Sequence, residues 1–185
     1  MPVIICMLRG VNVGGHNKIS MEILRELCSK LKLCDIQTYL QSGNAVFRAE
    51  ERDLDGLSKR IQVAIERKLG FRPEVILRTV PELRDAIARN PFAKRRGLEP
   101  RKLAVTFLAA DPGKEARENV LKIKMDPEEL RIDGREMYIY FPNGMGRPSF
   151  SWSVIERTLK VALTSRNWNT VTELLQIGES LEASR

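Results

Sequence analysis

The stretch LRIDGREMYIYF, which runs from Leu130 to Phe141, predicts the fold more strongly than any other part of the chain. The Asp133-Gly134 pair is typical of the tight turn that joins two antiparallel strands. A hairpin folded at this turn is expected to pair Leu130 with Met137. Its apolar residues then share one face: Ile132, Met137, Ile139 and Phe141.

The elements around this hairpin follow a recognisable order. An apolar strand at 102–110 precedes a helix that Asp111 and Pro112 are expected to start. After the hairpin, Ser153 and Glu156 match a capping box for a second helix, and a short strand is expected at 163–165. A second such box at Thr170 and Glu173 predicts the final helix. The order is βαββαβ followed by a helix.

The first half of the chain repeats this order. Val3–Arg9 is an apolar strand, and Ser20 is expected to cap the helix that follows. Strands at 35–41 and 45–49 are joined through Ser42-Gly43-Asn44. The remaining expected elements are a helix from Asp53 to Gly70, a strand at 74–80 and a short helix opened by Pro81.

Both halves therefore match the split βαβ, or ferredoxin-like, arrangement. The fold class that we predict is α+β, with two duplicated ferredoxin-like units, antiparallel sheets and an extra helix after each unit. The first unit is expected at 1–92 and the second at 102–185, joined by a basic linker at 93–101. One compact domain made of both units is the alternative. The duplication rests on element order alone.

Composition restricts the class of protein. No apolar run approaches the ~20 residues that span a bilayer, and the apolar run at 3–8 has no basic segment before it. The three cysteines lack C-x-x-C spacing, which suits a reducing compartment. We therefore expect a cytoplasmic protein with no membrane partner.

The positive charge is concentrated in one segment. The net charge is +7, and the segment around 94–102 contains only Glu99 to balance its cations. These cations are Lys94, Arg95, Arg96, Arg101 and Lys102. Such a run can bind nucleic acid by releasing counterions from phosphates. A solvated linker is the alternative.

The glycine-rich stretch LRGVNVGGHNK, from Leu8 to Lys18, nearly matches a phosphate-binding loop. His16 and Asn17 stand where that template requires Lys and a hydroxyl residue, and the dinucleotide pattern G-x-G-x-x-G fails as well. We therefore expect no nucleotide cofactor. Backbone N–H groups of a glycine turn can still bind a small anion. His16 is the only histidine, and neither a catalytic pair nor a metal-binding spacing is found around it.

Polar residues gather at three turns, and we select them as candidate ligand-binding residues. They are Arg9, Asn12 and Lys18 at the glycine stretch, Gln41, Ser42 and Asn44 at the first hairpin, and Arg166, Asn167 and Trp168 before the last helix. Ordinary turn and cap chemistry is the alternative for each group. Tyr138 and Tyr140 could stack on nucleic-acid bases, or they could be buried in the core.

Several stretches together resemble a known bacterial family, domain of unknown function 1697. They are LRGVNVGGHNKISMEILREL, IQTYLQSGNAVF and TSRNWNTVTELL, with NPF and FPNGMGRPSF between them. The resemblance implies an α+β fold with a ferredoxin-like duplication, and it implies no catalytic residue or cofactor. It is concentrated in the three turns already selected.

Three functions remain open from the sequence. The first is a non-catalytic module that binds a polyanion, with nucleic acid as the favoured partner and with Trp168 or Tyr138 stacking on bases. The second is an enzyme or sensor for a small phosphorylated or carboxylated ligand, which requires the polar turns to meet in space. The third is a self-associating interaction protein.

Overall fold

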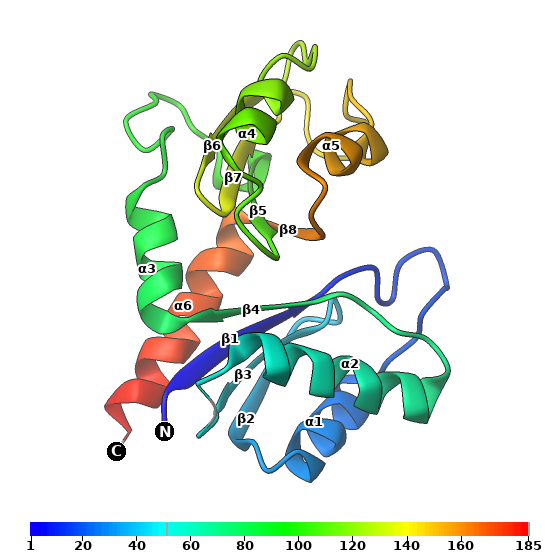
Figure 1. Ribbon diagram of the computed structural model, residues 1–185. Helices are drawn as coiled ribbons and strands as arrows, with labels where there is room; N and C mark the ends of the chain where they lie inside the picture. Colours follow the sequence, from blue (N-terminus) through cyan, green and yellow to red (C-terminus); the bar gives the residue numbers. More distant parts are fainter. Residues whose placement is uncertain (51, 185) are drawn as a thin grey trace. The chain divides into compact units, whose positions relative to one another are not determined.

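The computed structural model describes residues 1–50 and 52–184, which fall into two compact units (Figure 1). Unit 1 contains Met1–Arg84 and the chain from Glu173 on, and unit 2 contains Asp85–Thr172. Each unit is an α+β structure with one four-stranded antiparallel sheet, as predicted. No helix of the described residues is long and apolar enough to cross a membrane.

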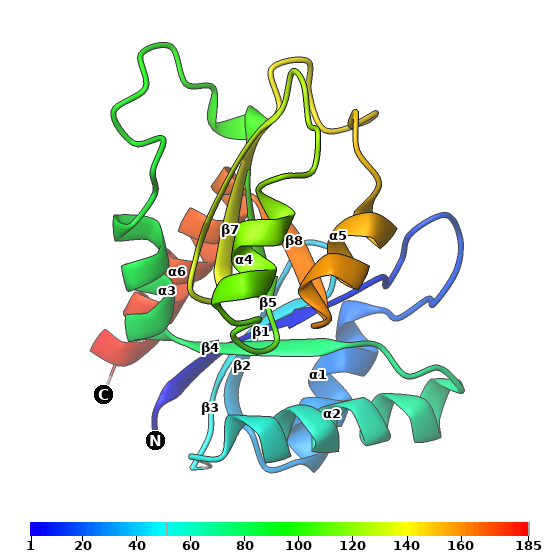
Figure 2. The ribbon, with the colours of Figure 1, turned by 45° about the horizontal axis from the view of Figure 1, so that its top comes forward.

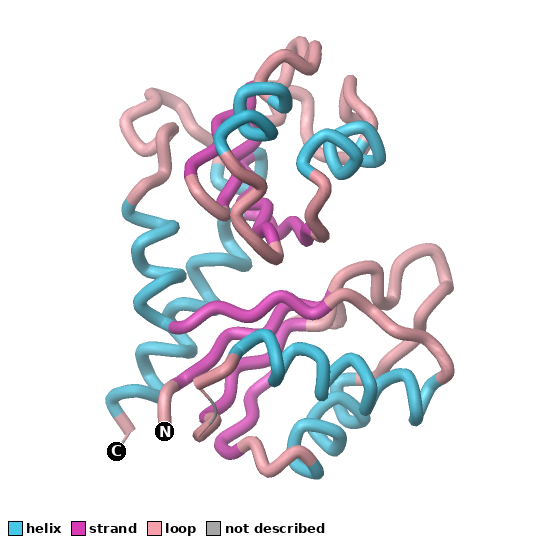
Figure 3. The backbone as a smooth tube through the Cα atoms, viewed as in Figure 1, coloured by secondary structure: helices cyan, strands magenta, loops and turns pink. Residues whose placement is uncertain are grey.

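Unit 1 has the predicted βαββαβ order. Its elements are β1 (Val3–Leu8), α1 (Met21–Lys30), β2 (Cys34–Tyr39), β3 (Asn44–Arg48), α2 (Leu54–Leu69) and β4 (Val75–Thr79). The sheet order is β2-β3-β1-β4, and α1 and α2 cover one face of it (Figures 1 and 3). Residues such as Cys6 and Phe47 of the sheet pack there against Leu24 of α1 and Ile61 of α2.

Local signals in the sequence fix the helix ends of unit 1. The Ser20 hydroxyl accepts a hydrogen bond from the N–H of Ile23 at 3.1 Å, so Ser20 caps α1 as predicted. Asp53 caps α2 in the same way, through the N–H of Gly56 at 2.9 Å. Gly70 ends α2 with φ +79°, a conformation that glycine adopts without steric cost.

Unit 2 repeats the order of unit 1. A 3₁₀ turn (Pro100–Lys102) precedes β5 (Leu103–Leu108), α4 (Lys114–Val120), β6 (Glu129–Asp133), β7 (Glu136–Tyr140), α5 (Trp152–Leu159) and β8 (Leu163–Asn167). Its sheet order, β6-β7-β5-β8, matches that of unit 1, and α4 and α5 cover one face (Figure 2). Met137 and Ile139 lie in the core beneath these helices.

The hairpin formed by β6 and β7 has a different register from the predicted one. Asp133 pairs with Glu136, so Gly134 and Arg135 form the turn, and Leu130 pairs with Ile139 rather than Met137. The predicted apolar face is unaffected, because a shift of two residues keeps each side chain on its face.

Three predicted caps of unit 2 are wrong by two or three residues. Gly113 rather than Asp111 precedes α4, because the Asp111 carboxylate accepts the N–H of Gly113 in a turn outside the helix. Ser151 rather than Ser153 precedes α5. The last helix, α6 (Trp168–Ala183), begins early because Asn167 Oδ1 accepts the N–H of Thr170 at 2.8 Å.

The division between the units falls inside two helices, α3 (Val80–Ala88) and α6. In unit 1, Gly178 of α6 packs against Val80 of α3 and against Ile5 of the sheet face opposite α1 and α2. Arg84 and Glu179 join the same two helices by an ion pair at 2.9 Å. Each trailing helix therefore contributes to both units.

A buried arginine occupies the same position in both units. Arg78 in β4 pairs with Ile5, and Arg166 in β8 pairs with Val105, each opposite the third residue of the first strand of its unit. Both side chains are buried. The next residue caps the trailing helix in each case, because Thr79 accepts the N–H of Glu82 as Asn167 accepts that of Thr170. The duplication therefore extends from element order to individual side chains.

The second face of the unit 2 sheet is buried as well. Tyr138 and Tyr140 are 0% and 7% exposed, and the Tyr138 hydroxyl donates to the Ala86 carbonyl of α3 at 2.6 Å. Burial raises the pKa of Tyr138 above its usual value. The burial alternative is confirmed, and Tyr138 is unavailable for stacking on bases.

Candidate functional site

The glycine stretch of unit 1 forms a miniature hairpin. Val13 and His16 face each other across an isolated β-bridge, and the His16 N–H donates to the Val13 carbonyl at 3.0 Å. The residues between them, Gly14 and Gly15, have φ values of +58° and +80°. A two-residue turn with both φ values positive strongly favours glycine. The glycine pair is therefore explained by the turn itself.

Asn12 joins the glycine stretch to the β2–β3 hairpin. Its side-chain nitrogen donates to the Gln41 carbonyl at 2.6 Å and to the Ile19 carbonyl at 2.8 Å, and its oxygen accepts the Ile19 N–H at 2.9 Å. Asn12 has φ +57°, which asparagine tolerates better than most residues. One side chain thus holds both ends of the stretch and the neighbouring turn together.

Close backbone packing brings the same two turns together at Gly43. The Leu8 N–H donates to the Gly43 carbonyl at 2.8 Å. A Cβ atom at Gly43 would lie 2.6 Å from Val11 Cγ2 and 2.8 Å from Leu8 Cβ. Two of the three predicted polar clusters, the glycine stretch and the first hairpin, therefore meet in unit 1.

A cavity of about 390 Å³ lies where these turns meet, and we call it the glycine-loop cavity. Its lining residues are Asn12, Gly15, Lys18, Ile19, Ser20 and Gln41. Lys18 is exposed and has no ion-pair partner within the described part of the chain. The segments 8–21 and 39–49 contain no Asp or Glu, and Lys18 is the only charged residue among these lining residues.

The other candidates of unit 1 have structural contacts. Asn44 is fully buried, and its side chain donates to the Tyr39 carbonyl at 3.0 Å and to the Ser42 hydroxyl at 2.9 Å. The Arg9 N–H donates to the Glu74 carbonyl at 2.9 Å. Neither Arg9 nor Asn44 lines the glycine-loop cavity.

The third predicted cluster belongs to unit 2 and does not line the glycine-loop cavity. Arg166 is 9% exposed, and its guanidinium donates to the Thr164 hydroxyl at 2.8 Å and to the Ser165 carbonyl at 2.9 Å. Asn167 caps α6, and Trp168 is the half-buried first residue of that helix.

Most of the predicted basic run is paired with carboxylates. Glu99 binds both Arg101, at 2.7 Å, and Lys102, at 2.6 Å, and these cations hold the pKa of Glu99 below its usual value. Arg95 pairs with Glu129 at 2.5 Å and lies 4.2 Å from the centre of the Tyr140 ring. Lys94 and Arg96 are exposed, without an ion pair among residues 1–50 and 52–184.

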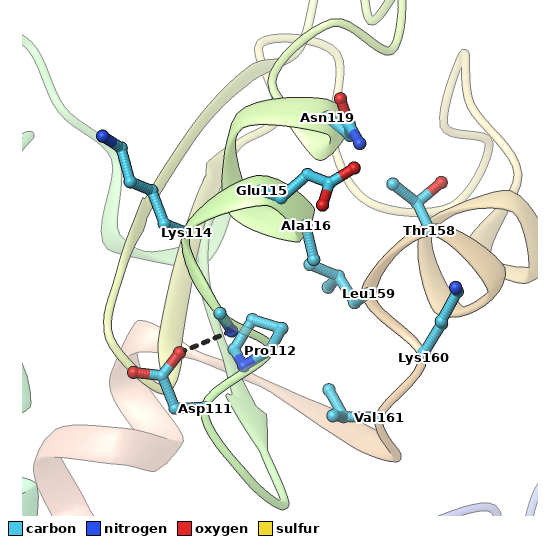
Figure 4. A pocket seen from close by; sticks show the side chains of 11 residues that line it. Asp111, Pro112, Lys114, Glu115, Ala116, Asn119, Thr158, Leu159, Lys160 and Val161 are labelled. Atoms are coloured by element: carbon cyan, nitrogen blue, oxygen red, sulfur yellow. Dashed lines mark hydrogen bonds between the residues drawn. The ribbon is translucent and has the colours of Figure 1, made fainter.

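The sequence reasoning missed a second cavity, of about 450 Å³, between α4 and α5 of unit 2 (Figure 4). Its walls carry Glu115 and Lys160, which are 45 residues apart, so no spacing pattern could have linked them. Neither residue carries a local signal of its own in the sequence.

The described residues contain no group of three or more His, Cys, Asp or Glu side chains that could hold a metal ion. The family model described as "Protein of unknown function (DUF1697)" matches residues 1–138. The chain belongs to this family. The match covers the glycine stretch and the β2–β3 hairpin, and it extends through the first part of unit 2 to Tyr138.

A solved structure has the same fold. The conserved bacterial protein SP0830 from Streptococcus pneumoniae is 22% identical, with a TM-score of 0.68, and the match covers 96% of this chain and 98% of that protein. No curated protein matches the sequence significantly.

Proposed function

We propose that this DUF1697 protein binds a small anion, a phosphate or carboxylate group, in the glycine-loop cavity. The observation that carries the proposal is the junction made by Asn12, which holds the glycine stretch and the hairpin turn around one cavity with Lys18 on its wall. A lysine ammonium binds phosphate and carboxylate as a strong point charge.

The surroundings of the cavity favour an anion over a cation. The segments 8–21 and 39–49 contain no carboxylate, so nothing there competes for Lys18. The Ser20 hydroxyl caps α1 and lines the same cavity, which places the positive end of the α1 dipole beside it. The lysine and the positive end of the helix dipole thus both attract an anion.

The test is a titration with inorganic phosphate and, separately, with acetate, followed by amide NMR signals. We expect saturable shifts at Gly15, Lys18 and Ser20. Lys18→Gln should weaken binding about tenfold, which corresponds to ~1.4 kcal/mol. Lys59→Gln removes the same charge from the exposed face of α2 in the same unit and should leave affinity unchanged. Equal losses in both variants would contradict the proposal, as would shifts that do not saturate.

Nucleic-acid binding is the second candidate, and the exposed cations Lys94 and Arg96 favour it. A single-stranded oligonucleotide titrated at two salt concentrations tests it separately. Salt-sensitive binding that is lost in the Lys94→Gln/Arg96→Gln variant and kept in Lys18→Gln would assign the polyanion to the 94–102 segment. Binding that is weak and independent of salt would exclude it.

A further inference from the structure

The cavity between α4 and α5 has one unpaired group of each charge on its walls. Asp111 is engaged by Arg117 and by the N–H of Gly113, and Lys114 lies 3.8 Å from Glu118. Glu115 and Lys160 form no ion pair with any residue that the structure describes. The carboxylate and the ammonium are therefore both available to a ligand.

The directions of these side chains agree with this role. Figure 4 shows the Glu115 carboxylate reaching from α4 toward Thr158 of α5, and Lys160 reaching along α5 toward the same space. Lys114, which is next to Glu115 in the chain, points away from the cavity. The two opposite charges thus lie on opposite walls of one cavity that is open to solvent, Glu115 on α4 and Lys160 at the end of α5.

The neutral polar groups of the cavity also include one hydrogen-bond acceptor and one donor. The Thr158 hydroxyl donates to the Val154 carbonyl at 2.8 Å, so its lone pairs are left to accept a hydrogen bond. The Asn119 oxygen accepts from Lys122 Nζ at 3.0 Å, so its amide N–H groups are left to donate. The cavity therefore offers acceptors at Glu115 and Thr158, and donors at Lys160 and Asn119.

Apolar side chains form the rest of the lining. Ala116 and Leu159 lie between the polar groups, and Pro112 and Val161 close the lower part of the cavity (Figure 4). A ligand that satisfies all these groups carries an ammonium, a carboxylate and a small apolar body. The cavity volume is in the range of small-molecule sites.

We infer that unit 2 binds a free aliphatic amino acid between α4 and α5, with its ammonium at Glu115 and its carboxylate at Lys160. This site is separate from the glycine-loop cavity and does not rest on the anion proposal. Opposite charges recognised at two points give selectivity for the zwitterion over either half-charged analogue.

The first experiment compares three probes on the unmodified protein by calorimetry or amide NMR. They are leucine, leucinamide, which lacks the carboxylate, and N-acetyl-leucine, which lacks the ammonium. Leucine should bind at least about tenfold more tightly than either analogue. Equal affinities for the three probes, or no saturable binding of leucine, would overturn the inference without any mutation.

The second experiment assigns each charge. Glu115→Gln should abolish the preference for leucine over N-acetyl-leucine and keep the preference over leucinamide. Lys160→Gln should do the reverse. Glu118→Gln removes a carboxylate of α4 that is not part of the cavity lining, and Lys114→Gln removes an ammonium whose side chain points away from the cavity; both preferences should survive in these variants. A loss in these controls equal to that in the cavity variants would also overturn the inference.

Discussion

Single residues hold the two turns of unit 1 together, and Asn12 is the clearest case. Its amide makes three hydrogen bonds that connect the glycine stretch with Gln41 of the hairpin turn. The sequence marked Asn12 as a polar turn residue, but it could not show a partner 29 residues away. The same holds for Gly43, whose turn role was predicted and whose contact with Val11 was not.

Gly43→Ala should destabilise unit 1 more than Gly70→Ala. The two glycines have nearly equal φ values, +78° and +79°, so the backbone strain of the substitution is matched. At Gly43 the new methyl would also overlap Val11 and Leu8, which adds roughly 1–3 kcal/mol, whereas nothing lies within 4 Å at Gly70. Urea unfolding of both variants measures the difference. Equal losses would show that the two turns do not pack as described.

At the scale of elements, strands and helices follow from the sequence better than caps do. Alternating apolar residues predict the hairpin at 129–140. The predicted apolar face is correct although the predicted register is wrong. Cap predictions fail where two polar residues a few positions apart can both start a helix. Asn167 and Thr170 both suit a helix start, and only the hydrogen bond between them decides which one caps α6.

Gly178→Ala tests the packing of α6 in unit 1. Alanine normally stabilises a helix interior by about 1 kcal/mol relative to glycine. Here its methyl would lie 2.8 Å from Val80 Cγ2, so we expect a net loss of stability instead. Val80→Ala removes the obstructing methyl. Gly178→Ala should therefore cost much less stability in a Val80→Ala background than in the unmodified protein. A simple gain from Gly178→Ala, measured by thermal unfolding, would contradict this contact.

At the scale of the whole molecule, the two units have the same order of strands and helices, which the sequence predicted. Equivalent side chains in the two units support the duplication. The sequence did not reveal that Arg78 and Arg166 are equivalent, because the residues beside them differ, Leu77 and Thr79 in unit 1 against Ser165 and Asn167 in unit 2. The candidate cavities were less predictable. Turn residues at 12 and 41 were selected in advance, whereas Glu115 and Lys160 carry no signal, because a solvated surface charge looks the same in a sequence.

Cys28 in unit 1 and Tyr138 in unit 2 are buried acids whose protonated forms are favoured in the folded state. Burial raises the pKa of Cys28 in unit 1 from 9.0 to about 12 and raises that of Tyr138 in unit 2 above 10.0. The unfolded chain therefore loses these protons first, and the stability that both groups contribute is complete below pH 9.0 and is lost as pH rises above it.

Tyr138→Phe should accordingly reduce the fall in unfolding free energy between neutral and strongly alkaline pH. The variant also loses the hydrogen bond to Ala86, which costs about 1 kcal/mol at neutral pH. Tyr39→Phe, on the half-buried edge strand β2, is the matched control. Its unfolding free energy should fall with pH as steeply as that of the unmodified protein. Denaturant unfolding at several pH values measures these slopes, and identical slopes for all three proteins would refute the assignment.

The sharing of α6 between the units affects the order in which a growing polypeptide can fold. Ribosomes deliver residues 1–84 first, yet the segment from Glu173 on, with Gly178 against Ile5 and Glu179 on Arg84, is made only after all of unit 2. Domains usually fold one after another during synthesis. Here part of the sheet face of unit 1 stays uncovered until residues from Glu173 on have been synthesised, so the first unit is still incomplete while unit 2 is being made.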